Sequence, residues 1–209
     1  MQIGTKKDPA TKRPRGRPRA YDPDTALRRA AQAFWKSGYA GTSLDDISAA
    51  TGMNRPSLSA AFGDKHAIYV KALSSYWDFK FAAMRKAFEG GGKLTDTLMK
   101  VYDAALSIYF ADDQQALGCF VVSTAITEAP GDAQIREIVA KGFDALDADF
   151  EALFRRARDN GELNAGADPT VLAQLAVATM HSIAVRARSG SSRSALRKLA
   201  QNTTAALCK

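Results

Sequence analysis

The chain is poor in the side chains that build metal and catalytic centres. Its 209 residues include two histidines, His66 and His181, and two cysteines, Cys119 and Cys208, which lie far apart in the sequence. Without a cluster of His, Cys and carboxylate residues, neither a zinc site nor a nucleophile–base pair can be assembled. No phosphate-loop or dinucleotide-binding motif is present either. The sequence therefore predicts no enzyme, no catalytic residue, no metal site and no cofactor.

Long apolar runs are also missing. We find no apolar run of about 18 residues, so no membrane span is expected, and the basic first residues lack the apolar segment of a signal peptide. Two separated cysteines without a secretory segment are typical of a reducing compartment. These absences predict a cytoplasmic protein. Cys119 has two possible roles, a small buried hydrophobic residue or a thiol at a helix N-terminus that senses oxidants or electrophiles.

Basic charge is concentrated at the N-terminus. The chain has 29 basic and 22 acidic residues, but residues 1–20 alone carry a net charge of +6. The RGRP sequence at residues 15–18 has the form of an AT-hook core, an extended segment whose arginines can lie in an A·T-rich minor groove. This arm either contacts DNA or is a solubilising tail, and its position before the motif described next favours DNA. The predicted contacts of the arm are Arg13, Arg15, Arg17 and Arg19.

Residues 42–65, TSLDDISAATGMNRPSLSAAFGDK, predict two short helices joined by a tight turn. Thr42 or Ser43 can cap the first helix, and Asp45 or Asp46 can complete a capping box. Gly52 can end this helix in the left-handed conformation. The segment therefore begins with a helix of about two turns.

The second helix of this segment is predicted to begin at about Arg55. Asn54 is a good N-cap, and Pro56 fits the first turn because it has no N–H to satisfy there. Leu58 and Phe62 are expected to face inward. An upstream helix over residues 21–39 completes a three-helix unit, which is the helix-turn-helix pattern of a DNA-binding domain.

The exposed residues of the second helix predict how the unit contacts DNA. Arg55 can donate to guanine O6 and N7, and Ser57 with the apolar edges of Pro56 and Ala60 can meet base edges or a thymine methyl. Side chains and helix N-terminal amides around the motif can hold phosphates. The predicted DNA-binding residues outside the arm are Thr42, Ser43, Arg55, Pro56, Ser57, Ser59, Ala60 and Lys65.

Residues 24–71 resemble the N-terminal domain of the TetR (tetracycline-repressor-like) family of bacterial transcriptional regulators. The resemblance includes the aromatic end of the first helix and the landmarks Gly38, Tyr39, Thr42, Ser43, Ile47, Gly52, Leu58, Phe62 and Lys65. It implies a sequence-specific regulator, usually a repressor, that a small-molecule ligand releases from a palindromic operator. The family commonly has Tyr where this chain has Ser59, which leaves the role of Ser59 in doubt.

The remaining residues predict an all-α second domain. A helix capped by Asp64 is expected to run to about Phe88 and to link the domains, followed by helices over residues 94–110, 117–127, 132–160, 169–189 and 192–207. The predicted organisation is a basic arm at 1–20, a helix-turn-helix domain at 21–66 and a helical ligand-binding and dimerisation domain at 67–209.

The helix at 169–189 is apolar on more than one face, so it should be buried on two sides. One side can face the domain core, and the other a second copy of the chain, as in a two-fold four-helix interface. The resemblance also implies a homodimer through the last two helices. Paired recognition helices would require a palindromic operator, with A·T-rich flanks if the arm binds the minor groove.

Aromatic and other large side chains of the second domain are candidates for lining an effector cavity. The alternative is that they are ordinary core residues. An apolar or aromatic effector is expected, contacting Trp77, Phe81, Tyr102, Leu106, Tyr109, Phe120, Phe143, Met180 and His181. Two other functions remain open: a low-specificity architectural DNA-binding protein that uses the arm, and an enzyme or carrier in the helical domain. In the leading interpretation the protein is associated with the bacterial nucleoid when DNA-bound.

Overall fold

The computed structural model describes residues 22–112 and 115–208, so the basic arm and its predicted contacts Arg13, Arg15, Arg17 and Arg19 lie outside the described residues. The described chain is all-α and contains no strand, as predicted. Its elements are α1 (Pro23–Ser37), α2 (Leu44–Thr51), α3 (Arg55–Phe62), α4 (Lys65–Glu89), α5 (Leu94–Tyr109), a turn of π-helix η1 (Val121–Ala125), α6 (Ile126–Glu128), α7 (Ala133–Asp159), α8 (Pro169–Arg188) and α9 (Arg193–Leu207).

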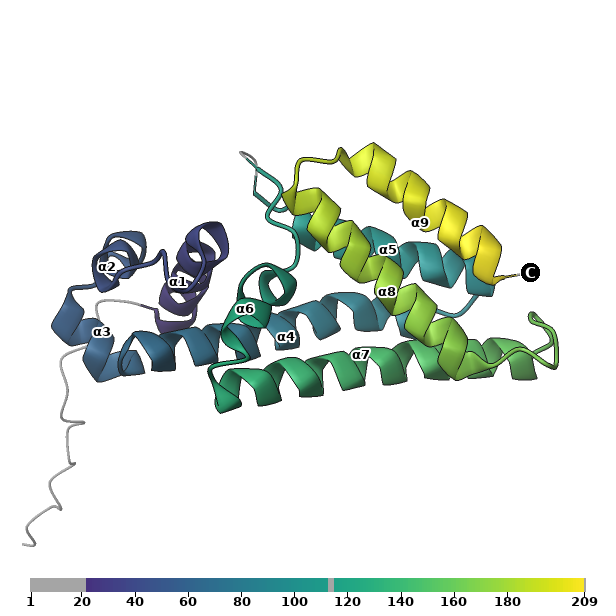
Figure 1. Cartoon of the computed structure of the whole chain (residues 1–209), viewed down its shortest axis with the longest axis horizontal. Helices are drawn as coiled ribbons and strands as arrows, with labels where there is room; N and C mark the ends of the chain where they lie inside the picture. The colour runs from purple at the N-terminus through teal and green to yellow at the C-terminus, as the bar shows by residue number, and fades with distance from the viewer. Residues whose placement is uncertain (1–21, 113–114, 209) are drawn as a thin grey trace, which may run out of the picture.

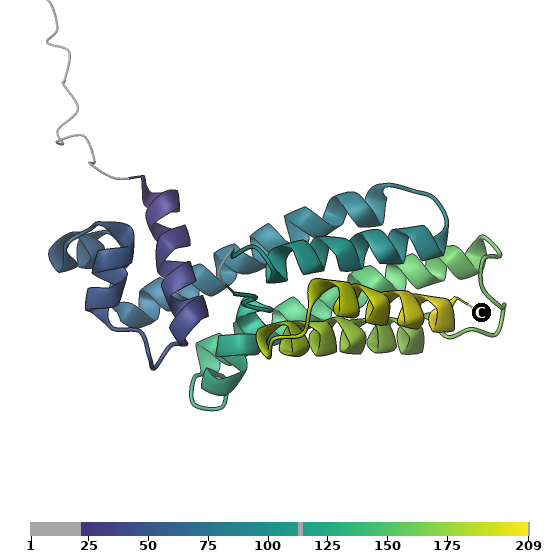
Figure 2. The same cartoon turned by 90° about the horizontal axis from the view of Figure 1, so that it is seen from above.

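Two parts are visible along the molecule (Figure 1). Helices α1 to α3 form one end, and α4 runs from that end into a bundle that also contains α5, α7, α8 and α9. Figure 2 shows α9 beside α8 at one side of the bundle. Helix α4 is therefore shared by both parts and connects them.

The short helices are defined by the side chains at their ends. Ser43 and Asp46 form a reciprocal capping box on α2, with the Ser43 amide 2.8 Å from Asp46 Oδ2 and the Asp46 amide 3.1 Å from Ser43 Oγ. Gly52 ends α2 at φ +71°. Asn54 caps α3 by accepting from the Ser57 amide at 2.9 Å. Capping is worth about 1 kcal/mol per helix end, which matters for helices too short to be stable alone.

The core of the N-terminal part is aromatic and aliphatic. Phe34, Ile47, Leu58 and Tyr69 are fully or almost fully buried, and the rings of Phe34 and Tyr69 meet edge-on with centroids 4.9 Å apart. Burial of each such side chain contributes about 1.5–3 kcal/mol. Helices α2 and α3, called the recognition unit below, therefore share one core with α1 and α4.

The helix expected over residues 117–127 is shorter and irregular in the structure. Residues 115–119 are not helical, and η1 begins only at Val121. The Leu117 and Gly118 amides both donate to the Tyr109 carbonyl, at 3.0 and 3.3 Å, and Gly118 has φ +67°. A residue in that conformation cannot continue an α-helix, which explains the difference.

The two parts of the molecule are connected at the C-terminal end of α1. Trp35 donates from Nε1 to the Leu117 carbonyl at 3.1 Å. Arg188, the last residue of α8, donates to the Trp35 carbonyl at 2.8 Å and to the Lys36 carbonyl at 3.2 Å. A displacement of α8 or of the segment around Leu117 would therefore act directly on α1.

Helix α8 is the one helix among the described residues that is long and apolar enough to cross a membrane, by length and composition alone. The core helix of a bundle meets the same criterion, and α8 packs between α7 and α9. The two-sided apolar character predicted for this helix explains why it does so.

Candidate nucleic-acid interface

One face of α3 is exposed and almost free of large side chains. Leu58 and Phe62 are buried against the core. Four of the other six positions are exposed, Arg55, Pro56, Ser59 and Ala60, and two are half-buried, Ser57 and Ala61. A helix with small outer side chains can approach the edges of base pairs closely in a major groove. The geometry thus places the predicted base-reading residues together on one surface.

Arg55 already has a partner within the chain. Its guanidinium contacts the Asp45 carboxylate with two hydrogen bonds, Nε to Oδ1 at 2.7 Å and Nη2 to Oδ2 at 2.5 Å. The hydrogen bond and charge of Asp45 raise the pKa of Arg55. Both side chains are more than half exposed, so water screens this pair and a nucleic-acid acceptor can replace the carboxylate. Sequence reasoning missed Asp45 because the pair spans the turn between α2 and α3.

Thr42 and Ser43 have different environments. Ser43 is the exposed N-cap of α2, whereas Thr42 is only 1% exposed. The Thr42 hydroxyl donates to the Gly38 carbonyl at 2.7 Å, and its amide donates to the Tyr39 carbonyl at 3.3 Å. Of the two candidates for the N-cap of α2, Ser43 takes that position. Both donors of Thr42 are used inside the fold, and its contact with a phosphate stays a prediction.

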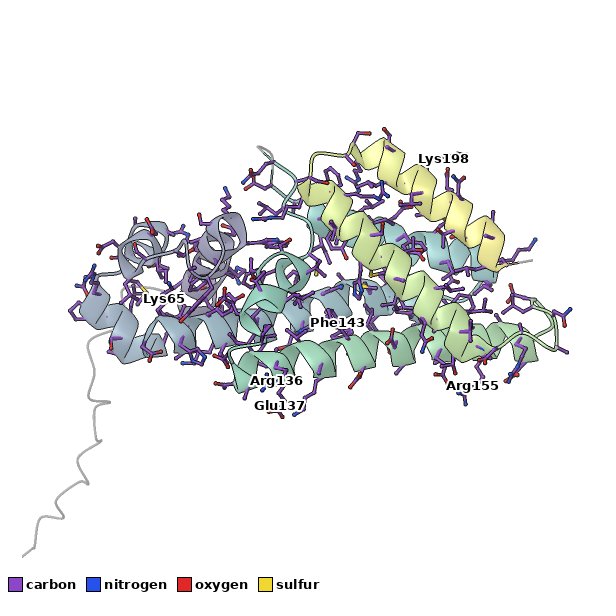
Figure 3. All side chains as sticks on the ribbon, in the orientation of Figure 1. Lys65, Arg136, Glu137, Phe143, Arg155 and Lys198 are labelled. Carbon is purple, nitrogen blue, oxygen red and sulfur yellow. The ribbon has the colours of Figure 1, made fainter. Side chains whose placement is uncertain are left out.

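Lys65 and Ser59 lie near the ends of the recognition surface. Lys65 is the first residue of α4, at the end of the molecule that carries α2 and α3 (Figure 3). Its ammonium lies 4.4 Å from the centroid of the Tyr39 ring, which orients it without neutralising its charge. Ser59 is exposed on α3. Both positions are compatible with phosphate contacts.

Four of the predicted effector residues form a continuous set of rings in the second domain. Phe81 stacks on Trp77 with centroids 5.3 Å apart, and Phe143 meets Trp77 edge-on at 5.9 Å. The Phe143 ring lies 4.7 Å from the His181 ring. Gly142 permits this arrangement, since a Cβ there would lie 2.1 Å from Trp77 Cε2.

The other predicted effector residues are distributed through the core. Tyr102, Leu106, Tyr109, Phe120 and Met180 are completely buried. The Tyr102 hydroxyl donates to the Ala176 carbonyl at 3.0 Å, so its polar end is already used. Phe120 lies instead beside Trp35 of α1, with centroids 5.7 Å apart.

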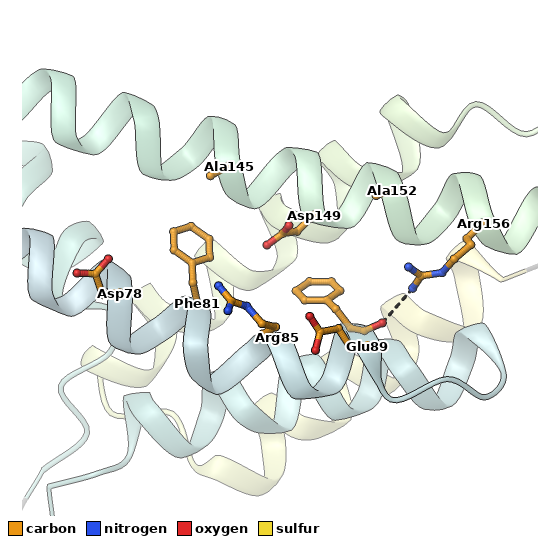
Figure 4. A pocket seen from close by; sticks show the side chains of 9 residues that line it. Asp78, Phe81, Arg85, Glu89, Ala145, Asp149, Ala152 and Arg156 are labelled. Atoms are coloured by element: carbon orange, nitrogen blue, oxygen red, sulfur yellow. Dashed lines mark hydrogen bonds between the residues drawn. The ribbon is translucent and has the colours of Figure 1, made fainter.

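A groove of about 530 Å³ lies between α4 and α7 (Figure 4). Of the predicted effector residues only Phe81 lines it. Acidic and basic side chains dominate the rest of its lining, which consists of Asp78, Arg85, Phe88, Glu89, Ala145, Asp149, Ala152 and Arg156. Burial raises the pKa of Asp149, although Arg85 opposes the effect. This groove is therefore not the apolar cavity that the sequence predicts.

Both cysteines are free thiols. Cys119 is buried immediately before the helical residues 120–128, and the Tyr76 hydroxyl donates to its sulfur at 3.2 Å. Over residues 22–112 and 115–208, no group of three or more His, Cys, Asp or Glu side chains could hold a metal ion. Among the described residues, Cys119 is thus a buried thiol with a hydrogen-bond donor, and it belongs to no group of metal-ligating side chains.

A capped helix-turn-helix that presents a small-residue surface, joined by a long helix to a larger helical bundle, defines a two-domain DNA-binding transcriptional regulator. Comparison with protein families agrees. Residues 26–72 match the model of bacterial regulatory proteins of the tetR family, and residues 95–203 match the tetracyclin repressor-like C-terminal domain. The chain belongs to the TetR family.

Individual relatives extend over most of the chain. The HTH-type transcriptional repressor ComR of Escherichia coli (strain K12) is 29% identical over 202 residues, covering 96% of each chain. An uncharacterized HTH-type transcriptional regulator, YezE of Bacillus subtilis (strain 168), is 30% identical over 149 residues, covering 71% of this chain and 76% of that protein. A solved structure of a cysteine mutant of the regulator CifR, complexed with 26bp double-strand operator DNA, superposes with a TM-score of 0.82 at 29% identity, over 91% of this chain and 99% of the other.

Proposed function

We propose that the protein is a repressor that binds a palindromic operator as a homodimer and is released from it by a small-molecule effector. The observation that carries the proposal is the exposed face of α3, on which Arg55 is the one long polar side chain among small residues. Similarity to the repressor ComR supports repression. We assign no enzymatic activity to the chain and place it in the bacterial cytoplasm.

The contacts with DNA divide into reading and positioning. Arg55 reads guanine, while Ser57 and the apolar edges of Pro56 and Ala60 meet neighbouring base edges. Ser43, Ser59 and Lys65 contact phosphates and fix the register. The arm outside the described residues adds charge and reaches an A·T-rich minor groove through its arginines. Low-specificity architectural binding is not favoured, since the structural relative CifR is complexed with operator DNA.

The surface of α8 supports the dimer. Val171, Leu175 and Val185 are 49%, 51% and 56% exposed. Val171 and Leu175 are neighbours at i,i+4 spacing, and Val185 lies on the same side of the helix nearer its C-terminal end. Exposed large apolar side chains in a row mark an interface. A second copy of α8 and α9 packed on this row would bury it and set the distance between two recognition helices.

The coupling between effector and operator uses the connection at α1. The segment at Leu117–Phe120 lies between the buried second-domain residues and Trp35, and Arg188 connects α8 to the same end of α1. An effector that displaces this segment would reorient α1 and with it the recognition unit. The two recognition helices of a dimer would then no longer match the spacing of the operator half-sites.

The test is fluorescence anisotropy on DNA from the upstream region of the protein's own coding sequence, with scrambled DNA of equal length as competitor. Arg55→Ala should weaken operator binding by about 10- to 100-fold, the value of one bidentate base contact, and change binding to scrambled DNA little. Removal of residues 1–20 should make the binding affinity for both DNAs depend less steeply on the salt concentration. Asp45→Asn frees Arg55 and should strengthen binding to both.

Arg155→Ala is the matched control. Arg155 is also exposed and paired with a carboxylate, that of Glu151, but it lies on α7 far from α3 (Figure 3). Its replacement should leave both affinities unchanged. Equal competition by scrambled DNA against the wild-type protein, on the upstream region and on DNA recovered by selection from a genomic library, would refute sequence-specific regulation and favour the architectural alternative.

A further inference from the structure

Four buried polar atoms have no hydrogen-bond partner among the described residues. They are Trp77 Nε1, Lys80 Nζ, Tyr109 Oη and His181 Nε2. Buried polar groups are normally paired, because desolvation without a partner is costly. All four belong to the second domain, on α4, α5 and α8. The core of that domain is thus supplied with donors that the protein itself does not use.

Lys80 is the most unusual of the four. It is completely buried, and its ammonium lies 5.0 Å from the centroid of the Trp77 ring. Burial lowers the pKa of Lys80, and the neighbouring Cys119 partly offsets this effect. A buried ammonium without an anion is among the least favourable arrangements in a protein core. An external anion could supply the missing partner of Lys80.

Contacts join three of the four groups into one cluster, since the Lys80 ammonium faces the Trp77 ring and the Phe143 ring connects Trp77 with His181. Burial, and next the charge of Lys80, lower the pKa of His181 to about 4. Burial, and next Cys119, raise the pKa of Tyr109, so both Lys80 and Tyr109 are within electrostatic range of the same thiol. The Phe143 ring bridges Trp77 and His181. One ligand could therefore contact donors from both α4 and α8.

The chemistry of the donors selects the ligand. An ammonium and an indole N–H can only donate, and a phenol and a neutral imidazole can donate to a strong acceptor. A carboxylate accepts several hydrogen bonds and carries the negative charge that would pair with the Lys80 ammonium. We propose that Lys80, with Trp77, Tyr109 and His181, binds the carboxylate of an effector whose apolar body packs among the aromatic rings beside them. This proposal rests on the effector-released regulator proposed above and names the chemical class of the effector.

The groove between α4 and α7 offers a route to this cluster. Phe81 lines the groove and stacks on Trp77, whose ring lies beside the Lys80 ammonium. Rotation of the Phe81 side chain would open the groove toward the unpaired donors. On the other side of the cluster, Cys119 adjoins Phe120, which contacts Trp35 of α1. A bound carboxylate would therefore lie next to the connection that moves the recognition unit.

The experiment compares acids with their neutral amides by thermal shift and calorimetry on the full-length protein. The probes are phenylacetate, indole-3-acetate and octanoate, each beside its primary amide. We expect at least one acid to raise the Tm and to bind at least tenfold more tightly than its amide. Lys80→Met should abolish this preference. Lys86→Met, a matched change of an exposed lysine on the same helix, should preserve it.

Lys80→Met also tests the proposal without a ligand. Methionine replaces an unpaired buried ammonium by an apolar side chain of similar length, so the free protein should become more stable, with a Tm a few degrees higher. A lower Tm would show that the protein itself already stabilises the Lys80 ammonium, and this would overturn the proposal. The absence of any preference for acids over amides would overturn it as well.

Operator anisotropy on the same preparations separates the two proposals. Discrimination between operator and scrambled DNA without a preference for acids would refute the carboxylate site and leave the regulator intact. A preference for acids that depends on Lys80, without any operator discrimination, would refute the regulator and leave the site.

Discussion

The half-buried imidazole of His181 predicts a specific loss of stability in mild acid. Burial, and next the charge of Lys80, lower its pKa from 6.5 to about 4 in the folded protein. His181 is therefore protonated below about pH 6.5 in the unfolded chain, but only below about pH 4 in the folded chain. By linkage, the free energy of unfolding falls as the pH falls through this window and is unaffected by His181 above it.

The size of the effect follows from the width of the window. Between pH 6.5 and pH 5 the difference in proton binding amounts to about 2 kcal/mol, at about 1.4 kcal/mol per pH unit. Because His181 is partly exposed, solvent screening reduces the expected loss to about 1–2 kcal/mol. Urea unfolding at pH 7.5 and pH 5.0 measures it.

His181→Phe isolates this contribution from all other titrating groups. Phenylalanine keeps the ring contact with Phe143 and cannot be protonated. The wild-type protein should lose about 1–2 kcal/mol more of its free energy of unfolding than the variant between the two pH values, because every other titratable group is common to both proteins. Equal losses in the two proteins would mean that His181 is protonated as easily in the fold as in water, and the account of a neutral buried imidazole beside Lys80 would be wrong.

Three further changes test the fold. Gly118→Ala should lower the free energy of unfolding by more than about 2 kcal/mol, because its Cβ would lie 2.4 Å from the Ala184 carbonyl oxygen. Gly91→Ala, at φ +62° with open space around it, should lower it by about 1 kcal/mol. Equal unfolding midpoints of the two variants would contradict the clash at Gly118. Leu175→Glu should convert a dimer to a monomer in analytical ultracentrifugation and weaken operator binding, whereas Phe79→Glu, at an equally exposed position on α4, should do neither; a dimeric Leu175→Glu protein would exclude the α8 interface. Phe34→Ala empties a fully buried site and should destabilise the N-terminal part by about 3–5 kcal/mol, seen as loss of helical circular dichroism and of operator binding below the wild-type Tm; an unchanged Tm would show that this part is not packed around Phe34.

The helix boundaries could be predicted because they depend on local chemistry. Ser43, Asn54 and Asp64 each accept a hydrogen bond from an amide of the helix that they cap, and such interactions involve residues three positions apart. The non-helical segment before η1 could not be predicted, because it depends on two amides that donate to the distant Tyr109 carbonyl.

The site was only partly accessible from sequence for the same reason. Exposure of Arg55 follows from the period of α3, but its pairing with Asp45 depends on the angle between two helices. Burial of Thr42 depends on the packing of the turn after α1. A signal for Lys80 did exist, since it falls at helical spacing with Trp77 and Met84 on the buried side of α4. A cation in an apolar stripe is a signal that its partner has to be sought, because a buried charge is costly when unpaired.

The outer face of α3 has an evolutionary consequence. Its exposed positions, among them Ser59 and Ala60, contribute no side chain to the core, while Leu58 and Phe62 secure the helix from the other side. Substitutions on the outer face should therefore have little effect on whether the protein folds. If this face reads the operator as proposed, they can change which operator is recognised. Duplicated copies of such a gene could diverge toward new promoters by single mutations, each with a folded protein at every step.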